Sequence, residues 1–176
     1  MIQTKFLFAA ALLSLTIAGA HAQGAAKPTL VGTFNDWTMW SYNGSYSGNG
    51  EGKICYIYSE PDSMQPPKLD HGRVSFSVTT SPSQGVENEA NFVAGYTLKE
   101  QSSVTIDIDG RKFTMFTQGD SAWLVDKKDE PALLSAMKAG RSMVIKATSR
   151  RGNDTTYNYS LRGVTAATDK MLAECK

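Results

Sequence analysis

Residues 104–116 restrict the fold more than any other part of the sequence, because two alternating segments there flank the dipeptide Asp109-Gly110. Asp-Gly is typical of a two-residue type I′ turn, since both central positions of that turn need positive φ angles. With this turn, Ile106 pairs with Phe113 on one face of the two strands. Both side chains are apolar, so that face is expected to be buried. The unit predicts antiparallel β-structure with one face in the core.

The rest of the chain repeats this pattern of short alternating or apolar segments separated by turn residues. A proline-containing stretch at 61–71 is expected to be irregular. Two segments have helical periodicity: one starts near Pro131 and ends at Gly140, and the other spans Val164–Cys175. The further strand candidates are residues 37–42, 54–59, 73–79, 92–98, 121–125, 143–149 and 156–161. Roughly eight or nine strands with two short helices, one at the C-terminus, predict a mainly β chain, either an antiparallel β-sandwich or a flattened barrel.

The first 22 residues have the composition of a secretory signal peptide. Lys5 supplies the positive end, residues 6–18 supply the apolar run, and Ala20-His21-Ala22 is a small-x-small cleavage site. A membrane anchor is the alternative, but the apolar run is short for a span of about 20 residues. The expected organisation is a signal peptide at 1–22, a flexible N-terminal arm at 23–34 and a single β domain at 35–176.

Export has consequences for location and charge. No later segment approaches membrane-spanning length, so we expect no transmembrane span in the mature chain and a periplasmic protein, associated with the envelope or secreted. The whole chain has a formal charge of +1, and Lys5 lies in the signal segment, so the exported chain is neutral. A neutral chain argues against nucleic acid as a partner, because such binding relies on positive charge.

Both cysteines, Cys55 and Cys175, lie after the signal segment. In an oxidising compartment the default is one disulfide between them. Cys55 lies in a strand-like run, and Cys175 lies on the apolar stripe of the C-terminal helix, so the bridge would attach the chain end to an early strand. Loop entropy for this interval gives an upper estimate of roughly 4–5 kcal/mol. A reactive thiol pair is the alternative, although the chain has no C-x-x-C motif.

Aromatic side chains are concentrated in the first predicted hairpin. On alternating strands about half of them should face the core. The other half could form a flat platform for a glycan or a partner protein. The sequence is compatible with both core packing and a candidate binding platform. The residues are Trp37, Trp40, Tyr42, Tyr46, Tyr56 and Tyr58.

Basic residues gather near the second predicted hairpin. Arg150 and Arg151 lie in its turn, and Lys146 and Arg162 are close in the sequence. A solvated hairpin tip is one interpretation of this candidate basic patch. Binding to an anionic polymer of the envelope is the other.

Gly119-Asp120-Ser121 resembles the nucleophile block of some esterases. A serine nucleophile needs a base, and His71 is the one histidine outside the signal segment. Those esterases carry their histidine near the C-terminus, where this chain has none. Asp107 and Asp109 lack the further ligands of a calcium loop. We therefore expect no catalytic residue, no metal site and no cofactor.

Several short stretches occur together from Arg73 to the end of the chain. They are residues 85–89 (GVENE), 108–110 (IDG), 116–123 (FTQGDSAW), 136–140 (AMKAG), 148–152 (TSRRG) and 159–163 (YSLRG). With an early tryptophan (Trp37 or Trp40), Cys55 and Cys175, the set resembles the invasion-associated locus B family of exported bacterial proteins. Residues 155–158 and Val164 depart from the family's pattern. The resemblance implies a periplasmic or envelope-associated protein, linked in some pathogens to host-cell invasion and virulence, and it does not imply an enzyme.

The leading hypothesis is a non-catalytic envelope protein that carries a disulfide and binds a partner protein or a surface polymer. A second hypothesis is an envelope hydrolase that uses Ser121, Asp120 or His71. A third is a purely structural role in the integrity of the envelope.

Overall fold

The alternating segments form eleven strands in residues 26–48 and 50–176, the part of the chain that the computed structural model describes. The signal peptide expected at 1–22 lies outside these residues, as does the start of the expected arm. The strands are β1 (Thr29–Phe34), β2 (Trp37–Gly44), β3 (Gly52–Ser59), β4 (Ser63–Gln65), β5 (Ser75–Ser81), β6 (Val86–Val93), β7 (Ser103–Ile108), β8 (Arg111–Gln118), β9 (Ser121–Leu124), β10 (Ser142–Thr148) and β11 (Asp154–Ser160). The α-helices are α1 (Glu130–Ala139) and α2 (Val164–Glu174), and the short 3₁₀ segments are η1 (Pro82–Gln84) and η2 (Lys127–Asp129).

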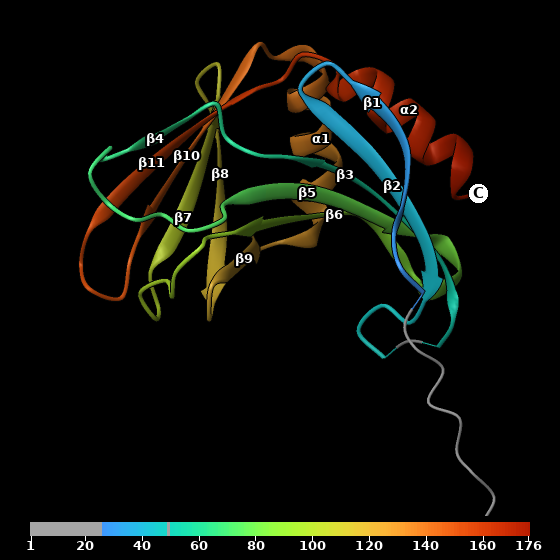
Figure 1. The fold of residues 1–176 in the computed structure, drawn as a ribbon, viewed down its shortest axis with the longest axis horizontal. Helices are drawn as coiled ribbons and strands as arrows, with labels where there is room; N and C mark the ends of the chain where they lie inside the picture. The colour runs from blue at the N-terminus through green and yellow to red at the C-terminus, as the bar shows by residue number, and fades with distance from the viewer. Residues whose placement is uncertain (1–25, 49) are drawn as a thin grey trace, which may run out of the picture.

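All the strands belong to one antiparallel sheet with the order β1-β2-β3-β5-β6-β9-β8-β7-β10-β11-β4. Figure 1 shows that the sheet bends strongly, so that β7, β10, β11 and β4 lie at one side of the molecule and β1, β2 and β3 at the other. Within the described residues the edge strands β1 and β4 do not pair, so the sheet is not closed into a barrel. The prediction of a mainly β, antiparallel fold with two helices is confirmed. The protein has a sandwich-like core, which lies inside one bent sheet.

The hairpin of β7 and β8 has the register that the Asp-Gly turn predicts. Ile106 pairs with Phe113. Asp109 and Gly110 have φ angles of 49° and 90°, the positive values that a type I′ turn needs. Ile106 is fully buried and Phe113 is 9% exposed, so this face of the hairpin packs in the core.

The structure corrects three of the expected segments. The second half of the expected arm, residues 29–34, is the edge strand β1, because it pairs with β2 along most of its length. A short strand, β4, interrupts the stretch expected to be irregular and pairs with β11. The strand expected at 92–98 instead occupies Val86–Val93. The chain leaves the sheet there because Gly95 packs against the 71–73 backbone, where a Cβ atom would lie 2.2 Å from the His71 carbonyl oxygen.

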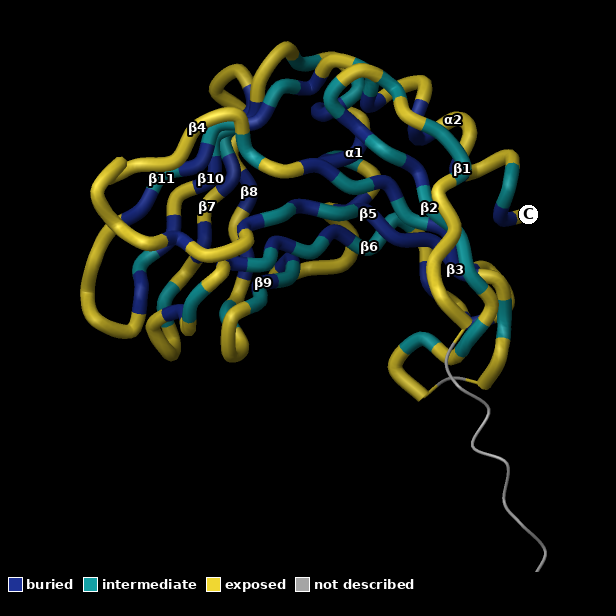
Figure 2. The backbone as a smooth tube through the Cα atoms, in the orientation of Figure 1, coloured by how far each residue is buried: buried dark blue, intermediate teal, exposed yellow. Residues whose placement is uncertain are grey.

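The core lies between the two sides of the bent sheet, where buried segments face each other (Figure 2). Phe76 on β5 contacts Tyr159 on β11, with ring centroids 6.2 Å apart. Phe92 on β6 contacts Tyr157 on β11, with ring centroids 5.4 Å apart. These pairs join strands far apart in the sheet order, so they hold the bend together through apolar burial.

The two helices cover the inner side of the sheet near β1–β3 and β6 (Figure 1). In α1, Pro131 lies in the first turn and Gly140 follows the last residue, as predicted. Gly140 has a φ angle of −84°, so conformational freedom does not explain the glycine. A Cβ atom there would lie 2.5 Å from Ile108 Cγ2, which indicates that the glycine is needed for close packing.

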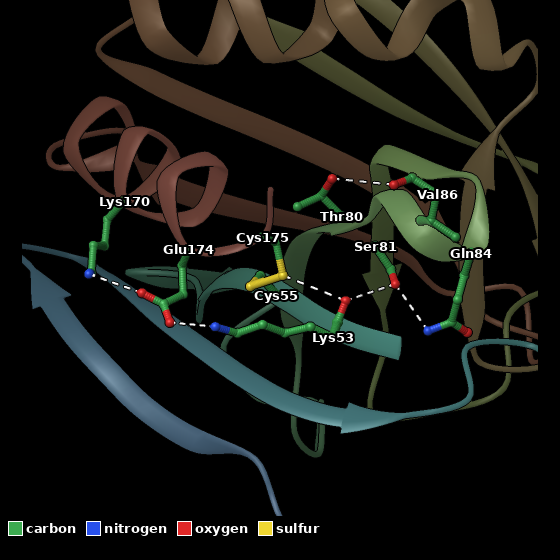
Figure 3. Close-up of a disulfide and its surroundings, with 9 residues drawn as sticks. All are labelled: Lys53, Cys55, Thr80, Ser81, Gln84, Val86, Lys170, Glu174 and Cys175. Carbon is green, nitrogen blue, oxygen red and sulfur yellow. Dashed lines mark hydrogen bonds and ion pairs between the residues drawn. A yellow bond between two sulfur atoms is a disulfide. The ribbon is translucent and has the colours of Figure 1, made fainter. Parts of the chain in front are cut away.

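The predicted disulfide between Cys55 and Cys175 is present, with Cα atoms 6.0 Å apart (Figure 3). Both cysteines are almost fully buried. Beside the bridge, Lys53 forms an ion pair with Glu174, which also pairs with Lys170 one turn earlier in α2 (Figure 3). The end of α2 is thus attached to β3 by a covalent bond and by a small group of charges.

Candidate binding surface

The outer side of β2 and β3, which faces away from the core, carries four of the aromatic residues named from the sequence. Alternation explains this placement, because Trp37 and Met39 on β2 point into the core, so Trp40 and Tyr42 point outward. Trp40 lies opposite Tyr56 across the strands. The four residues are Trp40, Tyr42, Tyr56 and Tyr58, and each is half-buried.

The other two aromatic residues of the predicted platform have different positions. Trp37 is fully buried, and its indole Nε1 donates a hydrogen bond to the Ser160 carbonyl at 2.9 Å. Tyr46 lies in the β2–β3 loop and donates a hydrogen bond to Glu89 Oε1 on β6 at 2.6 Å. Core packing therefore accounts for Trp37, and Tyr46 closes one end of the outer side of the sheet.

Two further aromatic residues, Phe116 on β8 and Trp123 on β9, belong to the same surface and were not identified from the sequence. They lie opposite each other across the strands, and their rings stack with centroids 5.9 Å apart. Phe116 is 46% exposed. Alternation gave a usable signal, because Phe116 follows the inward-facing Met115 and must point outward.

We call Trp40, Tyr42, Tyr56, Tyr58, Phe116 and Trp123 the outer aromatic surface. Between its two aromatic groups lie the central strands β5 and β6, where Ser77 pairs with Asn91. Tyr58 is next to Ser77 on one side, and Trp123 is next to Asn91 on the other. Since β3 and β9 are three strand spacings apart, the aromatic groups are separated by roughly 14 Å along the sheet. The surface therefore has aromatic edges and a polar centre.

Two hollows lie along this surface. The larger, about 800 Å³, is lined by Tyr56, Tyr58, Ser75 and Val93, together with residues 94–97, Arg73 and Asp120. The smaller, about 320 Å³, lies at the other aromatic edge and includes Phe116, Trp123, Tyr46 and Glu89. Each hollow combines aromatic rings with charged or polar side chains, which suits an amphipathic ligand.

Charged groups surround Tyr58 at the rim of the larger hollow. Its hydroxyl donates a hydrogen bond to Glu60 Oε1 at 2.7 Å, and the same carboxylate accepts one from Arg73 Nε at 3.1 Å. The Arg73 guanidinium lies 5.8 Å from the centre of the Tyr58 ring, within the range of a cation–π contact. Burial, and next the bond to Glu60, raises the pKa of Tyr58, so its hydroxyl is protonated at neutral pH.

The residues of the hydrolase hypothesis do not form a nucleophile–base pair. Both ring nitrogens of the buried His71 have other partners: Nδ1 lies 3.0 Å from the Tyr157 hydroxyl and Nε2 lies 2.9 Å from the Pro66 carbonyl oxygen. The Ser121 hydroxyl instead donates to Asp120 Oδ1 at 3.0 Å. Activation of Ser121 by His71 would require breaking one of the histidine's contacts.

Known proteins with a similar sequence or structure support this fold, and the sequence match includes every residue of the outer aromatic surface. The profile of the invasion associated locus B (IalB) protein family matches residues 40–172, well over half of the chain. The chain belongs to the IalB family. The crystal structure of invasion associated protein B from Bartonella henselae is similar, with a TM-score of 0.57 and 15% sequence identity over 82% of this chain and 97% of that chain. At this identity the likeness concerns the fold. No curated protein sequence matched the chain.

In this IalB family member the residues of the predicted basic patch fall into two groups. Arg150 and Arg151 are exposed in the β10–β11 turn, and Lys146 is exposed on β10. Arg162 lies beyond the opposite end of β11, where its guanidinium pairs with Asp36 at 3.1 Å. Arg162 is therefore separate from the other three residues, and the four do not form one surface.

In residues 26–48 and 50–176 no group of three or more His, Cys, Asp and Glu side chains is arranged to hold a metal ion. Over the same ranges, no helix has the length and apolar character needed to cross a bilayer. The disulfide indicates folding in an oxidising compartment.

Proposed function

We propose that this IalB protein is an exported envelope protein that binds a polysaccharide through its outer aromatic surface. The observation that carries the proposal is the row Tyr58–Ser77–Asn91–Trp123–Phe116, in which aromatic rings flank a polar centre on one face of the sheet. A sugar ring has an apolar C–H face that stacks on an aromatic ring and hydroxyl groups that need polar partners. The row offers both within one continuous surface.

A polysaccharide suits this surface better than a protein partner does. The centre of a protein–protein interface is depleted of charged residues and is more apolar than its rim. Here the order is reversed, because the aromatic groups lie at the edges and Ser77 and Asn91 lie at the centre. Asn91 uses its Nδ2 for the Ala122 carbonyl, which leaves its side-chain oxygen available to accept from a ligand hydroxyl.

The proposed location is the periplasm or the surface of the envelope. A signal-peptide composition at residues 1–22 and the disulfide both support export. The name of the family, and that of the similar Bartonella protein, connect this fold with invasion. Binding of a polysaccharide at a cell surface would be one physical route to such a role, without catalysis.

Replacement of Tyr58 by alanine should weaken polysaccharide binding by at least about tenfold, or ~1.4 kcal/mol. The ring lines the larger hollow and supplies the stacking face. The measurement is isothermal titration of the exported, oxidised protein with two soluble probes, hydroxyethyl cellulose and polygalacturonate. Tyr58→Phe should bind like the wild type, because it keeps the ring and loses only the contact with Glu60.

The matched control is Leu172→Ala on α2, which removes an exposed apolar side chain from a helix on the inner side of the sheet. This variant should bind both probes as the wild type does. Equal losses for Tyr58→Ala and Leu172→Ala, or no binding of either probe by the wild type, would contradict the proposal. Circular dichroism melts of each variant verify that the fold is kept.

A further inference from the structure

A third hollow, a cavity of about 370 Å³, lies under the β10–β11 turn. Its lining includes His71, Tyr96, Ser149, Arg150, Arg151 and Asn153. Gly95, Tyr96 and Thr97 line both this cavity and the larger hollow of the outer aromatic surface. The two spaces are therefore neighbours that share one short segment of chain.

The charge at this cavity is positive. Arg150 and Arg151 line it, and neither forms an ion pair with any residue in the described part of the chain. The one carboxylate in the lining is Asp70, whose Oδ1 accepts a hydrogen bond from the Gly72 amide at 3.0 Å. At neutral pH the two guanidinium groups and this carboxylate together have a net charge of +1.

The turn that carries the arginines is held in place by the backbone. The Arg150 amide donates to the Thr97 carbonyl at 2.9 Å, and the Lys99 amide donates to the Thr148 carbonyl at 2.9 Å. Inside the turn, the buried Ser149 hydroxyl oxygen accepts from the Asn153 amide at 3.1 Å. A ligand that binds here would therefore order side chains only, which lowers the entropic cost of binding.

The wall shared by the two spaces is also fixed. The Tyr96 hydroxyl lies 2.6 Å from Thr155 Oγ1 and 2.8 Å from the Tyr157 hydroxyl, which in turn contacts His71. The Thr155 hydroxyl extends this series of hydrogen bonds by donating to the Ala147 carbonyl at 3.0 Å. Tyr96 thus has a defined position between the arginines and the aromatic rings of β3.

We infer that the polysaccharide bound by this protein is acidic, and that the cavity under the β10–β11 turn holds a carboxylate of a sugar residue next to those stacked on Tyr56 and Tyr58. The inference rests on the proposed function. A guanidinium binds a carboxylate through two parallel hydrogen bonds, and the single excess positive charge matches a single carboxylate. Neighbouring sugars of one chain would occupy the hollow and the cavity, on either side of Tyr96.

The test compares polygalacturonate with the same polymer after full methyl esterification, which removes the charge and keeps the sugar backbone. At constant ionic strength the wild type should bind polygalacturonate at least tenfold more tightly than the ester. The double variant Arg150→Ala/Arg151→Ala should lose this preference and bind both polymers as the wild type binds the ester. Dextran sulfate serves as a probe of charge without the carboxylate.

The control is Arg111→Ala/Arg141→Ala, which removes the same charge from exposed arginines at the other end of β10. This variant should keep the preference for polygalacturonate. Equal binding of polymer and ester by the wild type, equal losses in the two double variants, or tighter binding of dextran sulfate than of polygalacturonate would overturn the inference. In each of these cases a loss on Tyr58→Ala would still support the proposed function, so the two failures are distinguishable.

Discussion

A variant with both Cys55 and Cys175 replaced by alanine is expected to lose about 2–5 kcal/mol of unfolding free energy. The bridge closes an interval of 120 residues, so its removal frees the unfolded chain from a long-range constraint. It also releases the end of α2, which covers β1, β2 and β3. Alanine is preferable to serine because both sites are almost fully buried and a hydroxyl there would need a hydrogen-bond partner.

Urea denaturation followed by tryptophan fluorescence measures this change. The wild type treated with a reducing agent should behave like the double variant, and the variant should not respond to the same agent. The outer aromatic surface faces away from the bridge, so the folded variant should still bind its ligand. Unchanged stability of the reduced wild type would show that the helix is held mainly by its packing on β1–β3.

Phe76→Ala is expected to cost about 3–5 kcal/mol of unfolding free energy. Phe76 is fully buried on β5 and its ring contacts Trp37 on β2 and Tyr159 on β11. The substitution would leave a cavity where the two sides of the bent sheet meet, a position at which neighbouring strands cannot easily collapse. Differential scanning calorimetry would record the loss as a lower melting temperature.

Phe116→Ala is the matched control, because it makes the same substitution on a ring that is 46% exposed on the opposite side of the sheet. Its cost should stay within about 1 kcal/mol, apart from the lost stacking on Trp123. Similar costs for the two phenylalanine variants would contradict the assignment of the core to the inner side of the bend.

Local signals were enough to predict the features that depend on neighbouring residues. The register of Ile106 with Phe113 follows from the Asp-Gly turn, and the ends of α1 follow from Pro131 and Gly140. The disulfide could also be predicted, because two cysteines in a chain with a signal-peptide composition have one intramolecular pairing.

Features that depend on distant partners could not be predicted. The strands β1 and β4 are short or weakly patterned and form at the sheet edges by pairing with β2 and β11. For the same reason the sequence suggests a patch that contains both Arg150 and Arg162, although Arg162 pairs with Asp36, 126 residues earlier. The position of Phe116 and Trp123 beside β6 depends on the strand order, which places β9 next to β6.

The most direct test of polysaccharide binding at the outer aromatic surface is a nuclear magnetic resonance titration of the isotope-labelled protein with hexagalacturonate. The expected result is a set of saturable chemical-shift changes. They should affect the backbone amide signals of Tyr56, Tyr58 and Asn91, the indole signal of Trp123, and backbone amide signals of the β10–β11 turn. The amides of α1 and α2 should stay unchanged. Shifts confined to the helices, or the absence of any saturable shift both with this oligomer and with hydroxyethyl cellulose, would contradict the proposed function.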